Sequence, residues 1–250
     1  MLTPKRHQLI LDFIDKHNTV TIQDLVELTD ASESTIRRDL SELERLEKIE
    51  RVHGGATLKH SKNQELSFPE KATKYIDEKK GIAKCAASFV EPNECIYLDA
   101  GTTTFEMIPY LAQQNVIVVT NGLTHLEALG RYEISTYLLG GFVKHNTRAL
   151  IGSGAISSLN NYRFDKCFLG VNGVHEHYGY TTPDPEEAMI KRSVLELAQQ
   201  QFVLADHTKL NTISFANIAD IHQATMITNE KVDVDVTPFQ NKTSVKVVSL

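Results

Sequence analysis

Small hydroxyl, amide and glycine residues follow three successive apolar runs of the chain, and the first of these sets has the composition of an anion site. The segment Asp99–Thr104 (DAGTTT) comes directly after the strand-like run Cys95–Leu98. A strand that leads through glycine into a hydroxyl-rich helix start presents backbone amides, the positive end of a helix dipole and hydroxyls together, which suits phosphate. Thr120-Asn121-Gly122 follows the next run and Gly140-Gly141 the one after. Because ligands of open α/β sheets bind beyond the carboxyl ends of the strands, we expect one shared phosphate site.

Taken singly, each of these motifs is also what a tight turn or a helix cap requires. The charged candidates carry similar alternatives. Lys209 follows the apolar run Phe202–Leu204 and suits phosphate as a point charge, although a lysine near a turn is commonly only solvated. Asp99 would repel phosphate unless it accepts a hydrogen bond from a sugar hydroxyl or pairs with a lysine. Glu187 either binds a sugar hydroxyl or forms a surface pair with Lys191 four residues on.

A second chemistry is indicated between residues 21 and 56, where two short helices and a basic hairpin are expected. In the second of these helices Ile36, Leu40 and Leu43 recur at helical spacing and form one buried stripe. The opposite face presents hydroxyls and guanidinium groups, which suit phosphates and the paired acceptors of guanine. The expected DNA contacts on this helix are Ser34, Thr35, Arg37, Arg38 and Ser41.

Three potentially cationic residues, Lys48, Arg51 and His53, then lead into Gly54-Gly55, which allows a tight turn between two short strands. These residues predict a wing that contacts phosphates, so the segment is typical of a winged helix-turn-helix. The alternative is a generic helical pair with a solvated charged face. Residues 1–60 contain nine Lys or Arg and eleven Asp or Glu, a net charge of −2, so the basic groups must be gathered on one face.

Local signals also predict the elements that position these residues. A first helix begins at Thr3-Pro4, a capping box of Thr21 and Asp24 begins a second, and the third begins at Ser32 or Ser34. From Phe68 onward, strand and helix patterns alternate, which predicts a mostly parallel sheet covered on both faces. The expected strands are Cys95–Leu98, Val116–Val119, Ile134–Leu139, Cys167–Leu169, Phe202–Leu204 and Thr225–Ile227. The expected helices are Pro69–Val90 with an interruption near Gly81, Thr103–Leu111, Ala149–Leu159 and Pro185–Gln200.

The prediction is therefore a DNA-binding domain over residues 1–57, a linker over 58–68 and an α/β sensor and oligomerisation domain over 69–250. The 250 residues carry a net charge of −6, with no apolar run long enough to span a membrane and no signal peptide, so a cytoplasmic protein is expected. Cys85, Cys95 and Cys167 are widely spaced without CxxC motifs. We expect no disulfide, no metal and no cofactor.

At these residues the chain resembles the DeoR family of bacterial transcriptional regulators. SESTIRRDLSELE followed by RVHGGA is similar to the DNA-binding signature of that family, and DAGTTT, VTNG, LLGG, GVNGV and ADHTK are similar to the motifs of its sensor domain. The resemblance implies a sensor related to ribose-5-phosphate isomerase. Together with the motif analysis it gives the expected effector contacts: Asp99, Gly101, Thr102, Thr103, Thr104, Thr120, Asn121, Gly141, Asn172, Glu187 and Lys209.

The resemblance further implies a dimeric or tetrameric repressor that binds double-stranded operator DNA and is released by a phosphorylated sugar. The match over YLDAGTTT, RFDKCFLGVNGV and GYTTPDPEEA is most similar to fructose operon repressors of Gram-positive bacteria, which implies fructose 1-phosphate. Lactose-pathway repressors that sense tagatose 6-phosphate are the nearest alternative.

Two alternatives of another class remain. One is a sugar-phosphate isomerase fused to a DNA-binding domain. The loop Gly170–Val174 lacks the carboxylate that such an isomerase needs, which leaves Glu176, Glu187, His175 and His177 as substitutes. The other is an architectural DNA-binding protein whose second domain only oligomerises, and the clustered anion donors argue against it.

Overall fold

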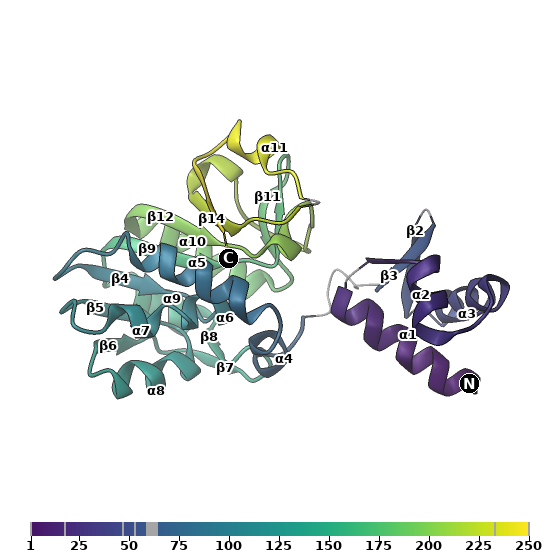
Figure 1. Ribbon diagram of the computed structural model, residues 1–250. Coiled ribbons are helices and arrows are strands. Elements are labelled where there is room, and N and C mark those ends of the chain that lie inside the picture. The colour runs from purple at the N-terminus through teal and green to yellow at the C-terminus, as the bar shows by residue number, and fades with distance from the viewer. Residues whose placement is uncertain are drawn as a thin grey trace. The chain divides into compact units, whose positions relative to one another are not determined.

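The computed structural model describes residues 2–17, 19–46, 48–52, 54–58, 65–232 and 234–249. The chain divides into two compact units, the first ending at residue 61 and the second beginning at residue 62 (Figure 1). The predicted linker 58–68 falls largely outside the described residues. Its described ends belong to regular elements, because a strand extends to Leu58 and a helix begins at Phe68.

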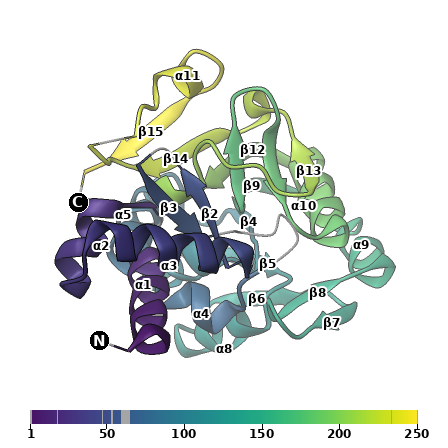
Figure 2. The same ribbon diagram turned by 90° about the vertical axis from the view of Figure 1, so that its right-hand side faces the viewer.

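The first unit is a winged helix-turn-helix, as predicted. Its elements are α1 (Thr3–His17), β1 (Thr19–Thr21), α2 (Ile22–Thr29), α3 (Glu33–Arg45), β2 (Ile49–Val52) and β3 (Gly55–Leu58). The three strands form an antiparallel sheet in the order β1-β3-β2, so the hairpin has a third strand, β1, that the sequence did not indicate. The expected stripe of Ile36, Leu40 and Leu43 is fully buried in one core with residues of α1 and α2. Figure 2 shows α3 beside these two helices.

The caps of this unit follow the local sequence. Thr21 Oγ1 accepts a hydrogen bond from the Asp24 amide at 3.1 Å, and the Asp24 carboxylate accepts one from the Thr21 amide at 2.8 Å, which completes the predicted capping box. Ser32, rather than Ser34, caps α3, because its hydroxyl accepts from the Thr35 amide. At the wing, Gly54 has φ +78°, a conformation that glycine adopts without strain.

The second unit is built on a seven-stranded sheet in the order β15-β14-β12-β9-β4-β5-β6. Every neighbouring pair in it is parallel, so the predicted mostly parallel sheet is confirmed. The strands are β4 (Cys95–Leu98), β5 (Ile117–Thr120), β6 (Ser135–Leu138), β9 (Phe164–Gly170), β12 (Ala198–Leu204), β14 (Thr225–Asn229) and β15 (Val245–Val248).

Helices cover both faces of this sheet. Along β4 the side chains alternate, since Ile96 and Leu98 belong to the core beneath α5 while Tyr97 belongs to the core beneath α9 and α10. The helices are α4 (Phe68–Ala72), α5 (Ile76–Ala87), α6 (Thr102–Phe105), α7 (Ile108–Leu111), α8 (Leu123–Arg131), α9 (Ser153–Leu159), α10 (Pro185–Leu197) and α11 (Thr237–Gln240), with 3₁₀ turns η1 (His207–Lys209) and η2 (Ile221–Gln223).

Two small antiparallel additions complete the unit. They are the hairpin β7 (Phe142–Lys144) with β8 (Ala149–Ile151), and the sheet of β10 (Gly173–His175), β11 (Gly179–Thr182) and β13 (Ala216–Ala219). The sequence analysis did not predict these strands or β15. They are three or four residues long, so they carry little periodicity.

Several predicted helix boundaries are wrong. The expected helix Pro69–Val90 breaks before Tyr75, which is left-handed at φ 53°, and Gly81 lies inside α5. Thr103–Leu111 is two short helices, α6 and α7. The first residues of the expected helix Ala149–Leu159 form strand β8, and the end of Pro185–Gln200 belongs to strand β12. In the last two cases tertiary strand pairing overrides a local apolar pattern that fits either helix or strand.

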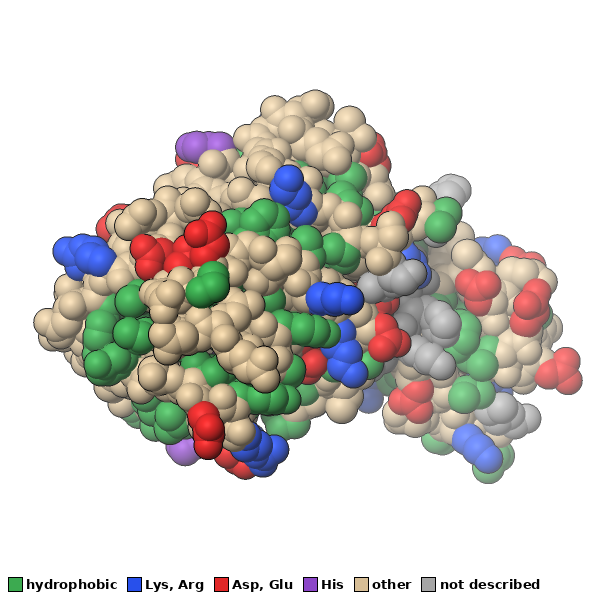
Figure 3. Space-filling view, turned by 60° about the vertical axis from the view of Figure 1, so that its left-hand side comes forward, with side chains coloured by type: hydrophobic (Ala, Val, Ile, Leu, Met, Phe, Trp, Pro, Cys, Tyr) green, Lys and Arg blue, Asp and Glu red, His purple; other side chains and the backbone are tan. Residues whose placement is uncertain are grey.

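The face of the second unit that Figure 3 shows carries apolar, acidic and basic side chains, and neither charge dominates it. The three cysteines are free thiols. Within the described ranges, no three His, Cys, Asp or Glu side chains are grouped as metal ligands, and no helix is both long and apolar enough to cross a membrane.

Candidate functional site

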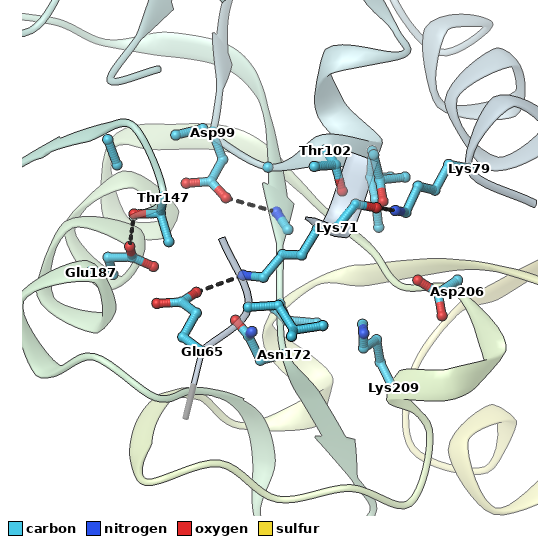
Figure 4. Close-up of a pocket in the computed structure, with 18 of the residues that line it drawn as sticks. Glu65, Lys71, Lys79, Asp99, Thr102, Thr147, Asn172, Glu187, Asp206 and Lys209 are labelled. Carbon is cyan, nitrogen blue, oxygen red and sulfur yellow. Dashed lines mark hydrogen bonds and ion pairs between the residues drawn. The ribbon is translucent and has the colours of Figure 1, made fainter. Parts of the chain in front are cut away.

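A polar pocket of about 790 Å³, counted to include space open to solvent, lies beyond the carboxyl ends of four neighbouring strands, β12, β9, β4 and β5. The turns that follow these strands supply one side, and the rest comes from α4, α5, α10, the β7–β8 hairpin and residues 65–66 and 74–75 (Figure 4). The polar residues that line it are Glu65, Lys71, Lys74, Tyr75, Lys79, Asp99, Thr102, Thr103, Asn121, Thr147, Asn172, Glu187, Lys191, Asp206 and Lys209. The predicted location at the strand ends is therefore where the structure has its pocket.

The turn after β4 is fixed by hydrogen bonds on the side that faces the protein interior. Thr104 Oγ1 lies 2.6 Å from the Asp99 carbonyl oxygen and 2.8 Å from that of Gly101, and 3.2 Å from His125 Nε2. Burial lowers the pKa of His125 to about 4, so the ring is neutral near pH 7. Thr102 and Thr103 line the pocket, whereas Thr104 turns inward and fixes the loop.

Asp99 is buried and pairs with a lysine, one of the two roles expected for it. The partner is Lys191 from α10, not Lys209, and the Asp99 carboxylate also accepts a hydrogen bond from the Gly170 amide at 3.0 Å. Both side chains of the pair are at most 7% exposed. Lys191 therefore neutralises Asp99 inside the pocket instead of forming a surface pair with Glu187.

Glu187 is likewise buried and lies in the pocket wall. Its Oε1 accepts hydrogen bonds from Thr147 Oγ1 at 2.7 Å and from Lys144 Nζ at 2.9 Å. Burial would lower the pKa of Lys144, but the charge of Glu187 and hydrogen bonds to neighbouring carboxylates raise it. The alternative of an exposed helix pair with Lys191 is wrong.

The other end of the pocket is lined by Lys71, Lys79 and Lys209. The Lys79 ammonium group donates to the backbone carbonyl of Lys71 (Figure 4). Burial lowers the pKa of Lys79 to about 8, with the positive charges of Lys209 and Lys71 acting in the same direction and Asp206 opposing them. Burial also lowers the pKa of Lys71. Burial is the largest cause of both shifts, and the positive charges of the neighbouring lysines add to it.

The two predicted asparagines line the pocket in different ways. Asn121 Oδ1 accepts from the Tyr97 hydroxyl at 2.9 Å and from the Ala100 amide at 3.0 Å, so this side chain ties the turns together. Asn172 Oδ1 accepts a hydrogen bond from Thr182, and its amide group has no acceptor among the described residues, which leaves a donor on the pocket surface.

Eight of the eleven residues predicted to contact the effector line this pocket: Asp99, Gly101, Thr102, Thr103, Asn121, Asn172, Glu187 and Lys209. Thr104, Thr120 and Gly141 do not. Thr120 Oγ1 accepts from the Gly122 amide beneath the turn. Gly141 has φ +144°, and a Cβ there would lie 2.6 Å from the Ile151 carbonyl oxygen, so its role is close packing.

The sequence analysis missed Lys71, Lys74, Lys79 and Thr147, and it misjudged Lys191. The lysines belong to helices α4 and α5 or to the segment between them, where a lysine on its own is normally a solvated residue. Only the packing of these helices against the strand ends brings their side chains to the pocket. The available signal was the density of lysines in Lys71–Lys80, just before the first strand of the sheet.

The DNA-binding unit presents most of its predicted contacts to solvent. Ser34, Arg37, Arg38, Ser41 and Lys48 are exposed, while Thr35 and Arg51 are half-buried. Arg51 donates to Ser41 Oγ at 3.1 Å, which links the wing to α3, and Arg37 pairs with Glu33 at 2.5 Å. Within the described residues, Arg38 has no hydrogen bond or ion pair. His53 lies outside the described residues.

A buried ion pair that the sequence analysis did not predict fixes α3 on α1. Arg6 Nε donates to Asp39 Oδ2 at 2.5 Å and Arg6 Nη2 to Oδ1 at 3.0 Å, and His7 Nε2 lies 3.0 Å from Oδ1. Burial by itself would raise the pKa of Asp39, but these hydrogen bonds and charges lower it below its ordinary value. The outward face of α3 is therefore oriented by a charged contact on its inward side.

Comparison with known proteins agrees with both halves of this description. Residues 6–62 match the model of the DeoR-like helix-turn-helix domain, and residues 74–231 match that of the DeoR C-terminal sensor domain. The chain is 51% identical over 249 residues to the uncharacterized HTH-type transcriptional regulator FruR of Bacillus subtilis, covering 99% of each chain. It is 34% identical over 232 residues to the HTH-type transcriptional repressor GlcR of the same organism, covering 92% of this chain and 90% of the relative.

Among solved structures, ribose 5-phosphate isomerase A of Neisseria gonorrhoeae matches 54% of this chain and 53% of its own at 19% identity, with a TM-score of 0.40. That similarity is too low to support a functional argument. The two family matches and the full-length relatives instead show that this chain, a DNA-binding head followed by a sensor with a lysine-rich pocket, belongs to the DeoR family of transcriptional regulators.

Proposed function

We propose that the protein represses a sugar-utilisation operon, most specifically one for fructose, and that fructose 1-phosphate releases it from operator DNA. The observation that carries the sensing half is the pocket beyond the strand ends, where several lysines meet a hydroxyl-bearing turn. The observation that carries the DNA-binding half is the exposed basic face of α3 in a winged helix-turn-helix.

The phosphate group is placed at the end of the pocket that Lys71, Lys79 and Lys209 share with Thr102 and Thr103. Burial, with repulsion from neighbouring lysines added to it, makes the charged forms of Lys71 and Lys79 costly in the empty pocket, as their lowered pKa values indicate. A dianionic phosphate removes that cost by pairing with them, and the threonine hydroxyls and turn amides add neutral donors.

The sugar hydroxyls are placed at the opposite end, against Asp99, Asn172 and Glu187. Buried carboxylates that already have a cationic partner retain lone pairs that accept hydrogen bonds from hydroxyl groups, and the Asn172 amide supplies a donor. One ligand with a phosphate at one end and hydroxyls at the other fits this division of the pocket. The ketohexose phosphates share this pattern.

The geometry favours binding over isomerisation. The turn Gly170–Val174 contributes Asn172 to the pocket and no carboxylate. Asp99 and Glu187 are held by Lys191 and by Lys144, so each is committed to an ion pair, whereas aldose–ketose isomerisation needs a carboxylate free to move a proton. His175 and His177 belong to the β10–β11 region and do not line the pocket.

On DNA, the first turns of α3 are placed in the major groove, with Ser34, Thr35, Arg37 and Arg38 facing base edges and Ser41, Lys48, Arg51 and His53 facing phosphates. A dimer or tetramer supplies two such heads to the two halves of the operator. The sugar phosphate favours an arrangement in which the heads no longer match the half-site spacing, so repression ends.

Calorimetric titration of the full chain with fructose 1-phosphate, fructose 6-phosphate and tagatose 6-phosphate tests the sensing half. Selective binding of fructose 1-phosphate supports the fructose assignment, and preference for tagatose 6-phosphate assigns the protein to the lactose pathway with the same architecture. Thr103→Ala combined with Lys209→Ala should abolish binding while DNA affinity is retained. Absence of binding to all three sugars would refute the proposed effector.

A further inference from the structure

The first residues of the second unit that the structure describes lie in the pocket proposed for the effector. Glu65, only 7% exposed at its side chain, lines the pocket together with Leu66. Its carboxylate bridges two ammonium groups, with Lys71 Nζ 2.7 Å from Oε1 and Lys144 Nζ 2.7 Å from Oε2 (Figure 4). Burial would raise the pKa of Glu65, but the charges of these lysines and their hydrogen bonds lower it, so the carboxylate is ionised.

Few other contacts hold this segment. The backbone carbonyl of Glu65 accepts a hydrogen bond from Asn146 Nδ2 at 2.9 Å. Beyond it, α4 has its own anchors, because Ser67 and Glu70 form a capping box and Phe68 is buried with its ring edge-on to Phe105. Residues 65–66, which we call the strap, are therefore held, among the described residues, mainly by the Glu65 carboxylate and by the contact with Asn146.

Two anionic groups compete for the Lys71 ammonium group: the Glu65 carboxylate of the strap and the phosphate group of the proposed ligand. In the empty pocket Lys71 pairs with Glu65, and it also lies with Lys79 and Lys209 at the end proposed for phosphate. Lys144 also pairs with Glu65, but that ammonium group is shared with Asp184 at 2.8 Å and Glu187 at 2.9 Å, so it alone balances the Glu65 charge poorly.

The local charge decides the outcome of this competition. Three carboxylates (Glu65, Asp184 and Glu187) and two ammonium groups (Lys71 and Lys144) carry a formal charge of −1. If the Lys71 ammonium group pairs with a phosphate dianion instead, the three carboxylates share one ammonium group, that of Lys144. The formal charge of this cluster is then −2, in a poorly solvated part of the pocket wall. Glu65 is the carboxylate that precedes the anchored helix, so it is the one that leaves for solvent.

We propose that Glu65 acts as an internal anion that holds the strap in the ligand-free sensor, and that a phosphate-bearing ligand frees the strap by taking Lys71 from it. This inference rests on the proposed phosphate site. Because the strap continues toward the DNA-binding domain, its release changes how that domain is tethered. The coupling is reciprocal, so a sensor without the Glu65 charge binds phosphate more tightly.

The test combines calorimetry with limited chymotrypsin digestion of the full chain, following cleavage after Leu66 by mass spectrometry. Cleavage of a folded protein under mild conditions tracks the population of the locally open form. In the wild type, fructose 1-phosphate should raise the initial rate after Leu66 roughly fivefold or more, within the usual range of allosteric coupling. Inorganic phosphate at higher concentration should act in the same direction.

Two variants and one control test separately the anchoring of the strap by Glu65 and its release by the ligand through Lys71. Glu65→Gln should show the fast cleavage without ligand and bind fructose 1-phosphate roughly fivefold more tightly or better. Lys71→Met should also cleave fast, with no further response to the sugar. Glu91→Gln, which removes an exposed carboxylate away from the pocket, should behave as the wild type.

The outcomes distinguish the strap from the site on which it depends. If fructose 1-phosphate binds but cleavage after Leu66 does not change, the strap is wrong and the effector assignment stands. If neither fructose 1-phosphate nor inorganic phosphate binds, the proposed phosphate site fails. Even then, equal cleavage of Glu65→Gln and the wild type would show that Glu65 does not hold the strap, and faster cleavage of the variant would support the tether.

Discussion

Replacing Asp39 by asparagine should destabilise the DNA-binding unit selectively. Asp39 is 4% exposed, and its carboxylate accepts a hydrogen bond from Arg6 Nε at 2.5 Å and lies 3.0 Å from His7 Nε2. Removing one charge of a buried ion pair costs about 3–5 kcal/mol, because the other charge loses its closest opposite charge in a poorly solvated place. Asparagine keeps the shape and one acceptor, so the lower part of that range is expected.

That cost is large for a unit of this size. At roughly 0.05–0.15 kcal/mol per residue, a unit that ends at residue 61 has a total stability of about 3–9 kcal/mol. Asp39→Asn therefore removes a third or more of it, and in a marginal case all of it. The sensor, a separate compact unit, should keep its unfolding midpoint and its ligand affinity.

The assay is hydrogen exchange of peptides from α3 in the full chain across a urea series, with sensor peptides as the internal reference. Glu33→Gln is the matched control, because it removes a carboxylate from the same helix in an exposed pair with Arg37, worth at most about 1 kcal/mol. The reasoning is refuted if the α3 peptides of Asp39→Asn open at the same urea concentration as those of Glu33→Gln. Because the pKa of Asp39 is lowered on folding, its contribution is present above the unfolded pKa of about 4 and is lost as pH falls through the folded value.

Three further predictions concern the two sites and the packing between strands. Arg38→Ala should weaken binding to a duplex selected with the wild type by about 1–3 kcal/mol, measured by fluorescence anisotropy, and unchanged affinity would contradict the base contact. Phosphate binding should weaken as pH rises through about 8, because the charged form of Lys79 is lost there, and Lys79→Arg should flatten that dependence in calorimetry. Gly141→Ala should destabilise the sensor by about 1–3 kcal/mol in thermal unfolding, because Gly141 has a positive φ and the new Cβ would clash with the Ile151 carbonyl oxygen. Gly130→Ala in α8 is the control, because a Cβ there has no atom within 4 Å, and it should be neutral or stabilising.

The sequence by itself determined the features that depend on near neighbours. The buried stripe of Ile36, Leu40 and Leu43, the capping box at Thr21 and the glycine turn of the wing follow from spacings of one to seven residues. The same holds for the strand cores of the parallel sheet and for the hydroxyl-rich turn after β4. These signals are local, because helix and strand periodicity and caps are properties of a short stretch of chain.

Only the tertiary structure decided which side chains meet. Asp99 pairs with Lys191, 92 residues away, and Asp39 with Arg6, 33 residues away. Lys71 and Lys79 become pocket residues because α4 and α5 pack beside the strand ends, and Gly141 becomes a packing residue because α9 and Ile151 close on it. Sheet order and helix packing set these distances, and no local pattern encodes which of many lysines will face which carboxylate. The chain alone therefore predicted the two binding chemistries and the edge of the sheet where the second one lies, whereas the charge pairing that governs that pocket is a product of the fold.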